Sequence, residues 1–272
     1  MPNNTREILD KYNIRLDKNK SQNYLIDNNK LNRILDFADI QPDEIILEIG
    51  AGIGTMTIPM AKRASKVVAI EKDPVIADVL RKRLVEENVD NVEVINDDAL
   101  KIDFPHFDKV VSNLPYQISS PVTFKLLNYD FERAVLMYQL EFAKRMNAPV
   151  DSREYSRLSV ALHFRADIRI LDTLSPRAFL PQPKVNSAVI ELVVKNDVEL
   201  NDIFDDVTRA LFQHKNKKAR KALVQSAHEL KRDKKELKNI LSTIDNPLFD
   251  EKVFKLSPEQ ILEISKILED MI

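Results

Sequence analysis

Glu48-Ile49-Gly50-Ala51-Gly52-Ile53-Gly54 is the stretch that decides the fold. It holds all three glycines of a 272-residue chain, at alternate positions. Glycine serves where a backbone takes a positive φ or approaches another group closely. The apolar residues 45–49 predict a buried strand, and residues 55–64 can begin a helix. A strand, a glycine turn and a helix form the nucleotide-binding element of doubly wound α/β folds, so we expect a bound cofactor rather than a turn without a ligand.

The composition excludes several classes of protein. Cysteine is absent, which excludes disulfides and thiolate metal sites, and the four histidines show no ligand spacing, so we expect no metal. No apolar run approaches the length of a membrane span, and residues 1–20 lack the apolar core of a signal peptide. We therefore expect a cytoplasmic protein that does not bind a membrane and carries a mobile arm over residues 1–20. Because no exposed apolar stripe stands out, we also expect a monomer.

Further apolar runs predict six more strands, at residues 66–71, 92–95, 109–112, 134–138, 168–173 and 188–194. Helical patterns separate the early runs, which predicts a mostly parallel sheet with helices on both faces, a Rossmann-like α/β fold. The last two runs are joined by the proline-rich residues 176–183, too short for a crossover helix, so we expect the last strand to run antiparallel. From about Val198 the pattern is helical, and we expect two domains, residues 1–196 and 197–272.

Polar side chains follow the predicted strands, where ligands bind in open α/β sheets. Glu71 lies 17 residues beyond Gly54, where a carboxylate can accept both hydroxyls of a ribose. Asp98 follows the third strand and can accept from an adenine amino group. A dinucleotide favours Gly-x-Gly-x-x-Gly with a helix N-terminus on the pyrophosphate, whereas Gly-x-Gly-x-Gly suits a cofactor without phosphate, such as S-adenosylmethionine.

Asn113-Leu114-Pro115-Tyr116 ends the fourth predicted strand and has a specific chemical interpretation. The exocyclic nitrogen of adenine is a poor nucleophile because its lone pair is delocalised into the ring. The Asn113 side-chain oxygen and the Leu114 carbonyl can each accept one of its N–H groups, which favours a pyramidal nitrogen aimed at a methyl donor. Tyr116 offers a face on which an unpaired base can stack. The alternative is a plain Asn/Pro turn with Tyr116 in the core.

A basic block lies in the helical tail. Residues 209–238 carry eleven Lys or Arg and three Asp or Glu, although the whole chain has a net charge of −2. A basic block on a mildly acidic protein suggests a polyanionic partner, and a solvated helix face is the alternative.

These motifs, in this order and spacing, resemble the ribosomal RNA adenine dimethyltransferases, the KsgA-type enzymes of the small subunit. The resemblance runs from about Ser21 to the C-terminus and rests on residues 22–25, 48–54, 71, 98–100, 113–116 and 179–185, with 211–218 and 256–259 in the tail. It implies the seven-stranded methyltransferase fold plus a small all-α C-terminal domain. It also implies N6,N6-dimethylation of two adjacent adenosines in the 3′-terminal hairpin loop of small-subunit rRNA, using S-adenosylmethionine, during subunit biogenesis.

The resemblance also implies roles for individual residues. The cofactor would be bound by Gln22, Asn23, Leu25, Gly50, Gly52, Glu71, Asp98 and Asn113, and the target adenine by Asn113, Leu114, Tyr116 and Phe179, with Tyr116 and Phe179 sandwiching the base. Phosphates would be contacted by Lys215, Lys217, Lys218, Arg220 and Lys221. The family usually has Phe where Tyr24 stands and often Pro where Ala51 stands, and this basic run is poorer in arginine.

Three alternatives stay open at this point. A large-subunit rRNA methyltransferase of the resistance type shares the motifs, but the long basic tail favours the small-subunit enzyme. A non-catalytic assembly or transcription factor on the same fold is disfavoured by the intact set Asn113, Tyr116 and Phe179. A NAD-dependent dehydrogenase is the third alternative, but this sequence offers no candidate acid, such as a suitably placed histidine, for hydride transfer. The expected partner is small-subunit rRNA or the immature small subunit.

Overall fold

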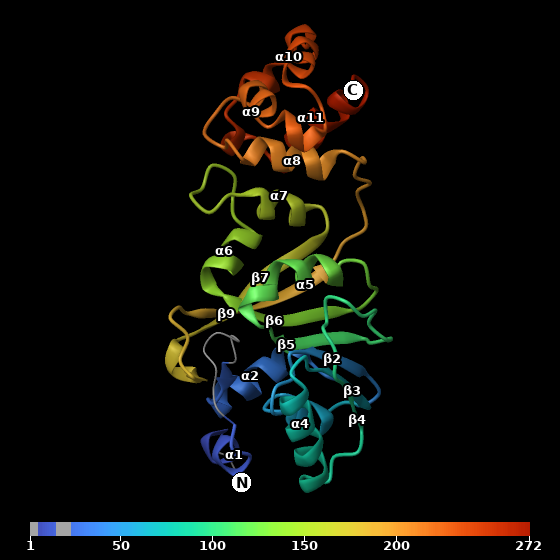
Figure 1. Cartoon of the computed structure of the whole chain (residues 1–272), viewed down its shortest axis with the longest axis vertical. Coiled ribbons are helices and arrows are strands. Elements are labelled where there is room, and N and C mark those ends of the chain that lie inside the picture. Colours follow the sequence, from blue (N-terminus) through green and yellow to red (C-terminus); the bar gives the residue numbers. More distant parts are fainter. Residues whose placement is uncertain (1–4, 15–22) are drawn as a thin grey trace. The chain divides into compact units, whose positions relative to one another are not determined.

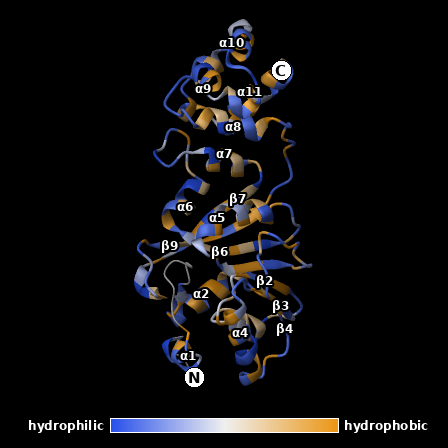
Figure 2. Ribbon diagram, in the orientation of Figure 1, coloured by the Kyte–Doolittle hydropathy of each residue, from blue (hydrophilic) through white to orange (hydrophobic). Residues whose placement is uncertain are grey.

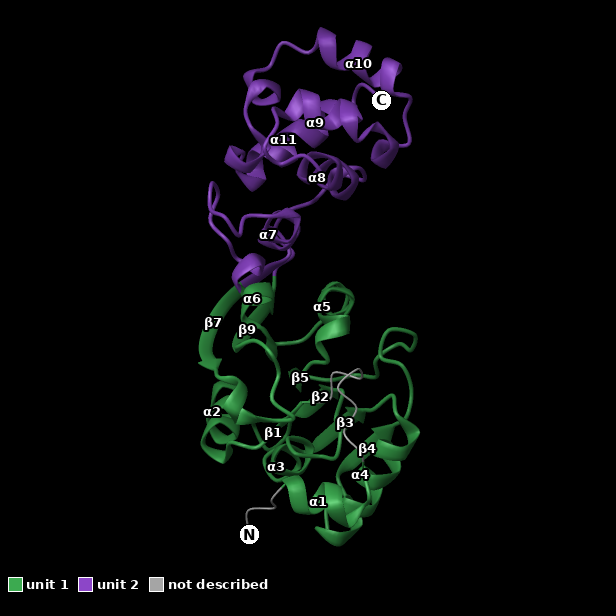
Figure 3. Cartoon of the chain, turned by 60° about the vertical axis from the view of Figure 1, so that its left-hand side comes forward, with its two compact units in different colours: residues 1–143, 168–194 green, residues 144–167, 195–272 purple. Residues whose placement is uncertain are grey.

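The computed structural model describes residues 5–14 and 23–272, and it divides into two compact units. The first comprises residues 1–143 and 168–194, and the second residues 144–167 and 195–272 (Figure 3). A single boundary near residue 196 is therefore wrong for residues 144–167. This segment contains α7 (Arg157–His163), whose Val160 packs in one hydrophobic cluster with Phe204 and Val207 of the tail. Such a long-range contact leaves no local signal in the sequence.

The first unit is built on a seven-stranded sheet, as predicted (Figure 1). Its strands, in spatial order, are β4 (Val92–Ile95), β3 (Lys66–Ile70), β2 (Ile45–Ile49), β5 (Lys109–Asn113), β6 (Arg133–Gln139), β9 (Ser187–Val194) and β7 (Ala166–Leu174). The pairs from β4 to β6 are parallel, and β9 runs antiparallel to β6, with Met137 opposite Val189. The predicted α/β class and the antiparallel last strand are thus confirmed.

Helices cover this sheet and position the loops at its carboxyl edge. α2 (Asn28–Ala38) packs on β5 and β6, α3 (Thr57–Ala61) on β3, and α4 (Pro74–Glu86) on β4. The Asp73 side chain caps α4 by accepting from the Val75 N–H at 3.0 Å, and Pro74 occupies the first turn, as the sequence predicts. Apolar residues concentrate along the strands, where both faces of the sheet are covered (Figure 2).

The expectation of a mobile arm over residues 1–20 is wrong for residues 5–11, which form α1 (Thr5–Lys11). Ile8 and Leu9 are buried in a cluster with Tyr24 and Ile53, and Lys11 lies 2.7 Å from Glu86 on α4. Two adjacent apolar residues, Ile8 and Leu9, suffice to dock this short helix, although the segment is polar overall.

The second unit is helical. Besides α7 it contains α8 (Phe204–Phe212), α9 (Ala219–Gln225), α10 (Lys234–Thr243) and α11 (Pro258–Glu269), and α6 (Leu140–Met146) leads into it. Its core includes Tyr155, Phe204, Leu211 and Phe249, all at most 1% exposed. Ser257 and Gln260 form a capping box at the start of α11. No helix of the described residues is both long and apolar enough to cross a membrane.

Candidate cofactor and methyl-acceptor site

A cavity of about 510 Å³ opens in the first unit, at the carboxyl ends of β2, β3, β4 and β5. Its lining brings together the predicted residues Asn23, Leu25, Gly50, Gly52, Glu71, Asp98, Asn113, Leu114 and Tyr116. The volume is that of a small-molecule site, and the location is where ligands bind in open α/β sheets. Gln22 lies outside the described residues, so its predicted contact with the cofactor stays a prediction.

The glycines let the loop after β2 pass close to its neighbours. Gly50 has a φ of +78°, and a Cβ there would lie 2.9 Å from the side chain of Pro115, in the turn of residues 113–116 that we call the acceptor turn. Gly52 has a φ of +58°, and a Cβ there would lie 2.8 Å from the Tyr24 ring. Any side chain at these positions would be strained and would collide with the chain itself. The glycine loop is therefore shaped by contact with the acceptor turn as well as by the cavity.

Glu71 is held in place by backbone donors. Its carboxylate accepts from the Gly52 N–H and the Asp73 N–H, each at 2.8 Å, and the residue is 9% exposed. Burial raises the pKa of Glu71, and these backbone hydrogen bonds oppose the rise. A carboxylate has about four acceptor positions, so the two oxygens retain capacity for ribose hydroxyls.

Glu48 is a second buried acid in the lining, and the sequence motifs assigned it no role of its own. It is 2% exposed and accepts from the Thr57 hydroxyl at 2.5 Å. Burial and, to a smaller extent, the nearby charge of Glu71 raise the pKa of Glu48 to about 8, although the hydrogen bond from Thr57 opposes the rise. Glu48 therefore carries its proton at neutral pH. Its place one residue before the end of a buried strand was the available signal.

Asp98 lines the cavity from the loop that follows β4. One carboxylate oxygen accepts from the Leu100 N–H at 3.0 Å, and the other lies 2.9 Å from Lys72 Nζ. The hydrogen bond from Lys72 lowers the pKa of Asp98. Lys72 also lines the cavity, and sequence reasoning missed it although it directly follows Glu71.

The acceptor turn is anchored at both ends. Asn113 Nδ2 donates to the backbone carbonyl of Asn23 at 2.7 Å, which commits the amide nitrogen and leaves Oδ1 as an acceptor. The Tyr116 hydroxyl and Ser187 Oγ are 2.6 Å apart, and burial raises the pKa of Tyr116. Ser187, at the start of β9, is fully buried and carries no signal in the sequence that would place it here.

Phe179 is not among the residues that line the cavity. It lies in β8 (Phe179–Leu180), which pairs antiparallel with β1 (Tyr24–Leu25), and its side chain is 1% exposed in the hydrophobic core. The structure therefore does not place it opposite Tyr116 as a free stacking face, because core packing takes up its ring. Its role in an aromatic sandwich stays a prediction.

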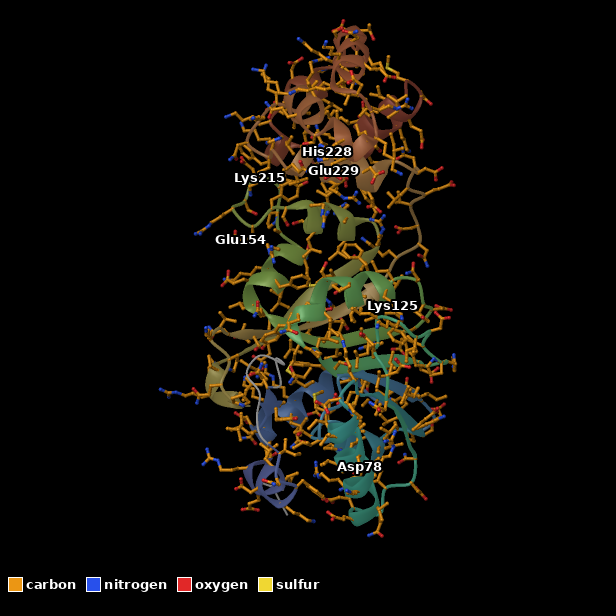
Figure 4. The ribbon with its side chains drawn as sticks, in the orientation of Figure 1. Asp78, Lys125, Glu154, Lys215, His228 and Glu229 are labelled. Carbon is orange, nitrogen blue, oxygen red and sulfur yellow. The ribbon has the colours of Figure 1, made fainter. Side chains whose placement is uncertain are left out.

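The basic residues predicted to contact phosphate fall into two groups. Lys215 Nζ donates to the carbonyls of Arg153 and Tyr155, which flank Glu154 (Figure 4), and Arg220 donates to the carbonyls of Leu241 and Ile244. Both cations are therefore engaged by backbone carbonyls within the second unit. The exposed group is Lys217, Lys218 and Lys221, of which Lys217 donates to Gln225 and Lys218 lies 3.5 Å from Asp250.

The family model for ribosomal RNA adenine dimethylase matches residues 13–270. The chain belongs to this family. It is 68% identical over 266 residues to a probable ribosomal RNA small subunit methyltransferase A of Methanosphaera stadtmanae, covering 98% of each chain, and 45% identical to the protein of that name from Pyrococcus furiosus, covering 96% of this chain and 95% of the other.

Two solved structures extend the family comparison. A dimethyladenosine transferase from Plasmodium falciparum has a TM-score of 0.74 at 30% identity, over 89% of this chain and 98% of that one. The 23S rRNA methyltransferase ErmE has a TM-score of 0.64 at 27% identity, over 91% of this chain and 100% of that one. The predicted methyltransferase fold is therefore confirmed for this adenine dimethylase family member.

Proposed function

We propose that this protein transfers methyl groups from S-adenosylmethionine to the N6 atoms of two adjacent adenosines in the 3′-terminal hairpin loop of small-subunit rRNA. The observation that carries the proposal is the hydrogen bond from Asn113 Nδ2 to the Asn23 carbonyl, in the same cavity as Glu71 and Asp98. This hydrogen bond leaves the amide oxygen of Asn113 as an acceptor in a cavity that also contains Glu71 and Asp98, two carboxylates that can accept hydrogen bonds from an adenosine.

The residues of the cavity fit the proposed cofactor. Glu71 would bind the ribose hydroxyls and Asp98 the adenine amino group, while Gly50 and Gly52 allow the backbone to lie close to the methionine part. Bound there, S-adenosylmethionine supplies an electrophilic methyl group on a sulfonium. The described residues contain no group of three or more potential metal ligands, and the proposed transfer needs none.

The acceptor turn would activate the target amine. Asn113 Oδ1 and the Leu114 carbonyl each accept one N–H of the adenine amino group, which removes nitrogen lone-pair density from the ring and directs it at the methyl donor. Tyr116, fixed through Ser187, would support the face of the base. After the first methyl replaces one N–H, one of these two acceptors is free.

The second unit would orient the RNA. Lys217, Lys218 and Lys221 are exposed, and lysines of this kind contribute affinity for the phosphate backbone rather than base identity. RNA is read most readily in single-stranded loops, whose bases can be splayed out and stacked. A naked rRNA or an immature small subunit both present such a loop, and we expect the enzyme to act as a monomer in the cytoplasm.

A large-subunit target is the second candidate, because the ErmE structure is similar over most of this chain. The names of the relatives that are 44–68% identical favour the small subunit. The hydrogen bond that fixes the orientation of Asn113 disfavours a non-catalytic assembly role, because a protein that only binds RNA would not need this side chain oriented.

Transfer of a labelled methyl group to ribosomal subunits tests the proposal. We expect unmethylated small subunits to yield N6,N6-dimethyladenosine at two neighbouring loop positions. Purified large subunits are the matched control and should stay unlabelled. Label on the large subunit alone would support the second candidate, and cofactor binding without transfer to either subunit would support a purely assembly-related role.

A further inference from the structure

The ammonium group of Lys125, on α5 (Ser119–Leu126), is committed to uncharged partners. Its Nζ donates to the backbone carbonyl of Ala99 at 2.8 Å and to that of Ile102, and it lies 4.4 Å from the centroid of the Phe104 ring. The side chain is partly buried beside the loop that follows β4 (Figure 4). Lysine side chains are mostly exposed and hydrated. Lys125 instead has two carbonyls and an aromatic face as partners, so its position is fixed by tertiary contacts.

The loop that Lys125 holds forms one wall of the cofactor cavity. Residues 97–100 line the cavity, and the turn is closed on Asp98, whose carbonyl accepts from the Lys101 N–H at 2.8 Å. Its far end is anchored by Phe104, whose N–H donates to the Tyr129 hydroxyl at 3.0 Å and whose ring packs on that of Tyr129. Lys125 attaches the middle of the loop, between these two points.

The helix that carries Lys125 begins beside the other wall. Tyr116, Gln117 and Ile118 line the cavity and lead directly into α5. Lys125 therefore joins the loop that carries Asp98 to the helix that starts at the acceptor turn, without lining the cavity itself. The separation of these two walls sets the distance between an adenine bound at Asp98 and an amine bound at Asn113.

We propose that Lys125 is a positioning residue of the cofactor site. It holds residues 98–102 at the place where Asp98 meets the adenine amino group, through the two carbonyls and the Phe104 ring. The inference rests on the proposed function, and specifically on Asp98 as the adenine acceptor. Lys125 would not touch the cofactor; it would increase affinity by holding Asp98 in the position that binding requires.

Calorimetric titration with S-adenosylhomocysteine tests the proposal with four variants. We expect Lys125→Met to raise Kd about tenfold, or about 1.4 kcal/mol, with unchanged binding stoichiometry. Lys125→Arg should bind nearly as the wild type does, because a guanidinium can donate to both carbonyls and stack on Phe104. Lys144→Met is the control, an exposed lysine of α6 that does not line the cavity, and should leave Kd unchanged. Asp98→Ala reports the primary contact, because it removes both acceptor oxygens, whereas Asn would keep one.

The outcomes separate the inference from the proposed function. If Asp98→Ala raises Kd and Lys125→Met does not, the role of Lys125 is wrong while the adenine assignment stands. If Lys125→Met raises Kd and Asp98→Ala does not, the loop is positioned for another contact and the assignment of Asp98 is wrong. A fall in stoichiometry and melting temperature with unchanged Kd would make Lys125 a purely structural residue. In methyl transfer we expect a higher KM for the cofactor with kcat nearly unchanged.

Discussion

Asn113 Nδ2 lies 2.7 Å from the backbone carbonyl of Asn23, a residue 90 positions earlier in the chain. This hydrogen bond determines which end of the Asn113 amide is available to a substrate amine. It also links the segment before β1 to the acceptor turn, so that two walls of the cavity are held together by one side chain.

Replacing Asn113 with Asp tests the orientation of this side chain. The substitution keeps the shape but removes the donor to Asn23, and it places a carboxylate oxygen against a carbonyl oxygen. We expect methyl transfer to fall about 10²-fold or more, because a preorganised contact to the transition state is lost. Asn113→Ala should abolish transfer and leave cofactor affinity largely intact. An active Asn113→Ala enzyme in single-turnover assays would contradict the account of amine activation.

Glu71 should control cofactor affinity. We expect Glu71→Ala to weaken S-adenosylmethionine binding by roughly 1–3 kcal/mol, measured by calorimetry, since hydrogen bonds to a charged group are lost. Glu71→Gln is the control, because it keeps an acceptor for the Gly52 or Asp73 N–H that the carboxylate now binds. Burial raises the pKa of Glu71, so affinity should begin to fall at a higher pH than for an exposed glutamate as the solution is acidified. Unchanged affinity in the Ala variant would exclude the ribose role.

Ser187 should act through Tyr116. Removing its hydroxyl leaves the Tyr116 hydroxyl without its partner at 2.6 Å, so the ring is held less firmly beneath the target base. We expect Ser187→Ala to raise KM for RNA severalfold while the Kd for the cofactor is unchanged. Tyr116→Phe is the matched variant and should give a similar KM. If the double variant Ser187→Ala/Tyr116→Phe shows the sum of two independent effects, the two hydroxyls do not work as a pair.

Glu48 should make stability depend on pH. Its pKa rises from an ordinary 4.5 to about 8 in the folded protein, so the folded state binds this proton more tightly than the unfolded state does. The resulting stabilisation is complete below about pH 4.5 and is lost as the pH rises through 8. We expect the free energy of unfolding to decrease between pH 6 and 9 by a few kcal/mol in the wild type relative to Glu48→Gln, measured by urea denaturation. Parallel pH profiles would show that Glu48 does not bind this proton.

The two groups of basic residues should respond differently to substitution. Changing Lys217, Lys218 and Lys221 to Gln should weaken RNA binding and reduce the salt slope by about 0.7 per lost phosphate contact on a single strand, with little change in melting temperature. Arg220→Gln is the contrasting variant and should lower the melting temperature, because two backbone carbonyls lose their donor. A salt slope unchanged in the triple variant would make these lysines a solvated face.

Local patterns sufficed for the parts of this protein that depend on neighbouring residues. Alternating glycines after an apolar run specify a strand and a tight loop, and the polar groups Glu71, Asp98 and Asn113 each lie at or just after the end of a strand. Because parallel strands end at one edge of a sheet, their convergence follows from strand order, and the cavity contains all three. The Asp73-Pro74 start of α4 likewise depends on adjacent residues alone.

The sequence by itself determined the fold class, the cofactor edge of the sheet and the family, because these follow from short-range periodicity and motif spacing. Only the tertiary structure decided which side chains are already engaged. It committed Asn113 to Asn23 and Tyr116 to Ser187, buried Phe179 in the core, and tied Lys215 and Arg220 to backbone carbonyls. Each of these contacts joins residues far apart in the chain, and a buried polar group takes whichever partner the packing brings within reach.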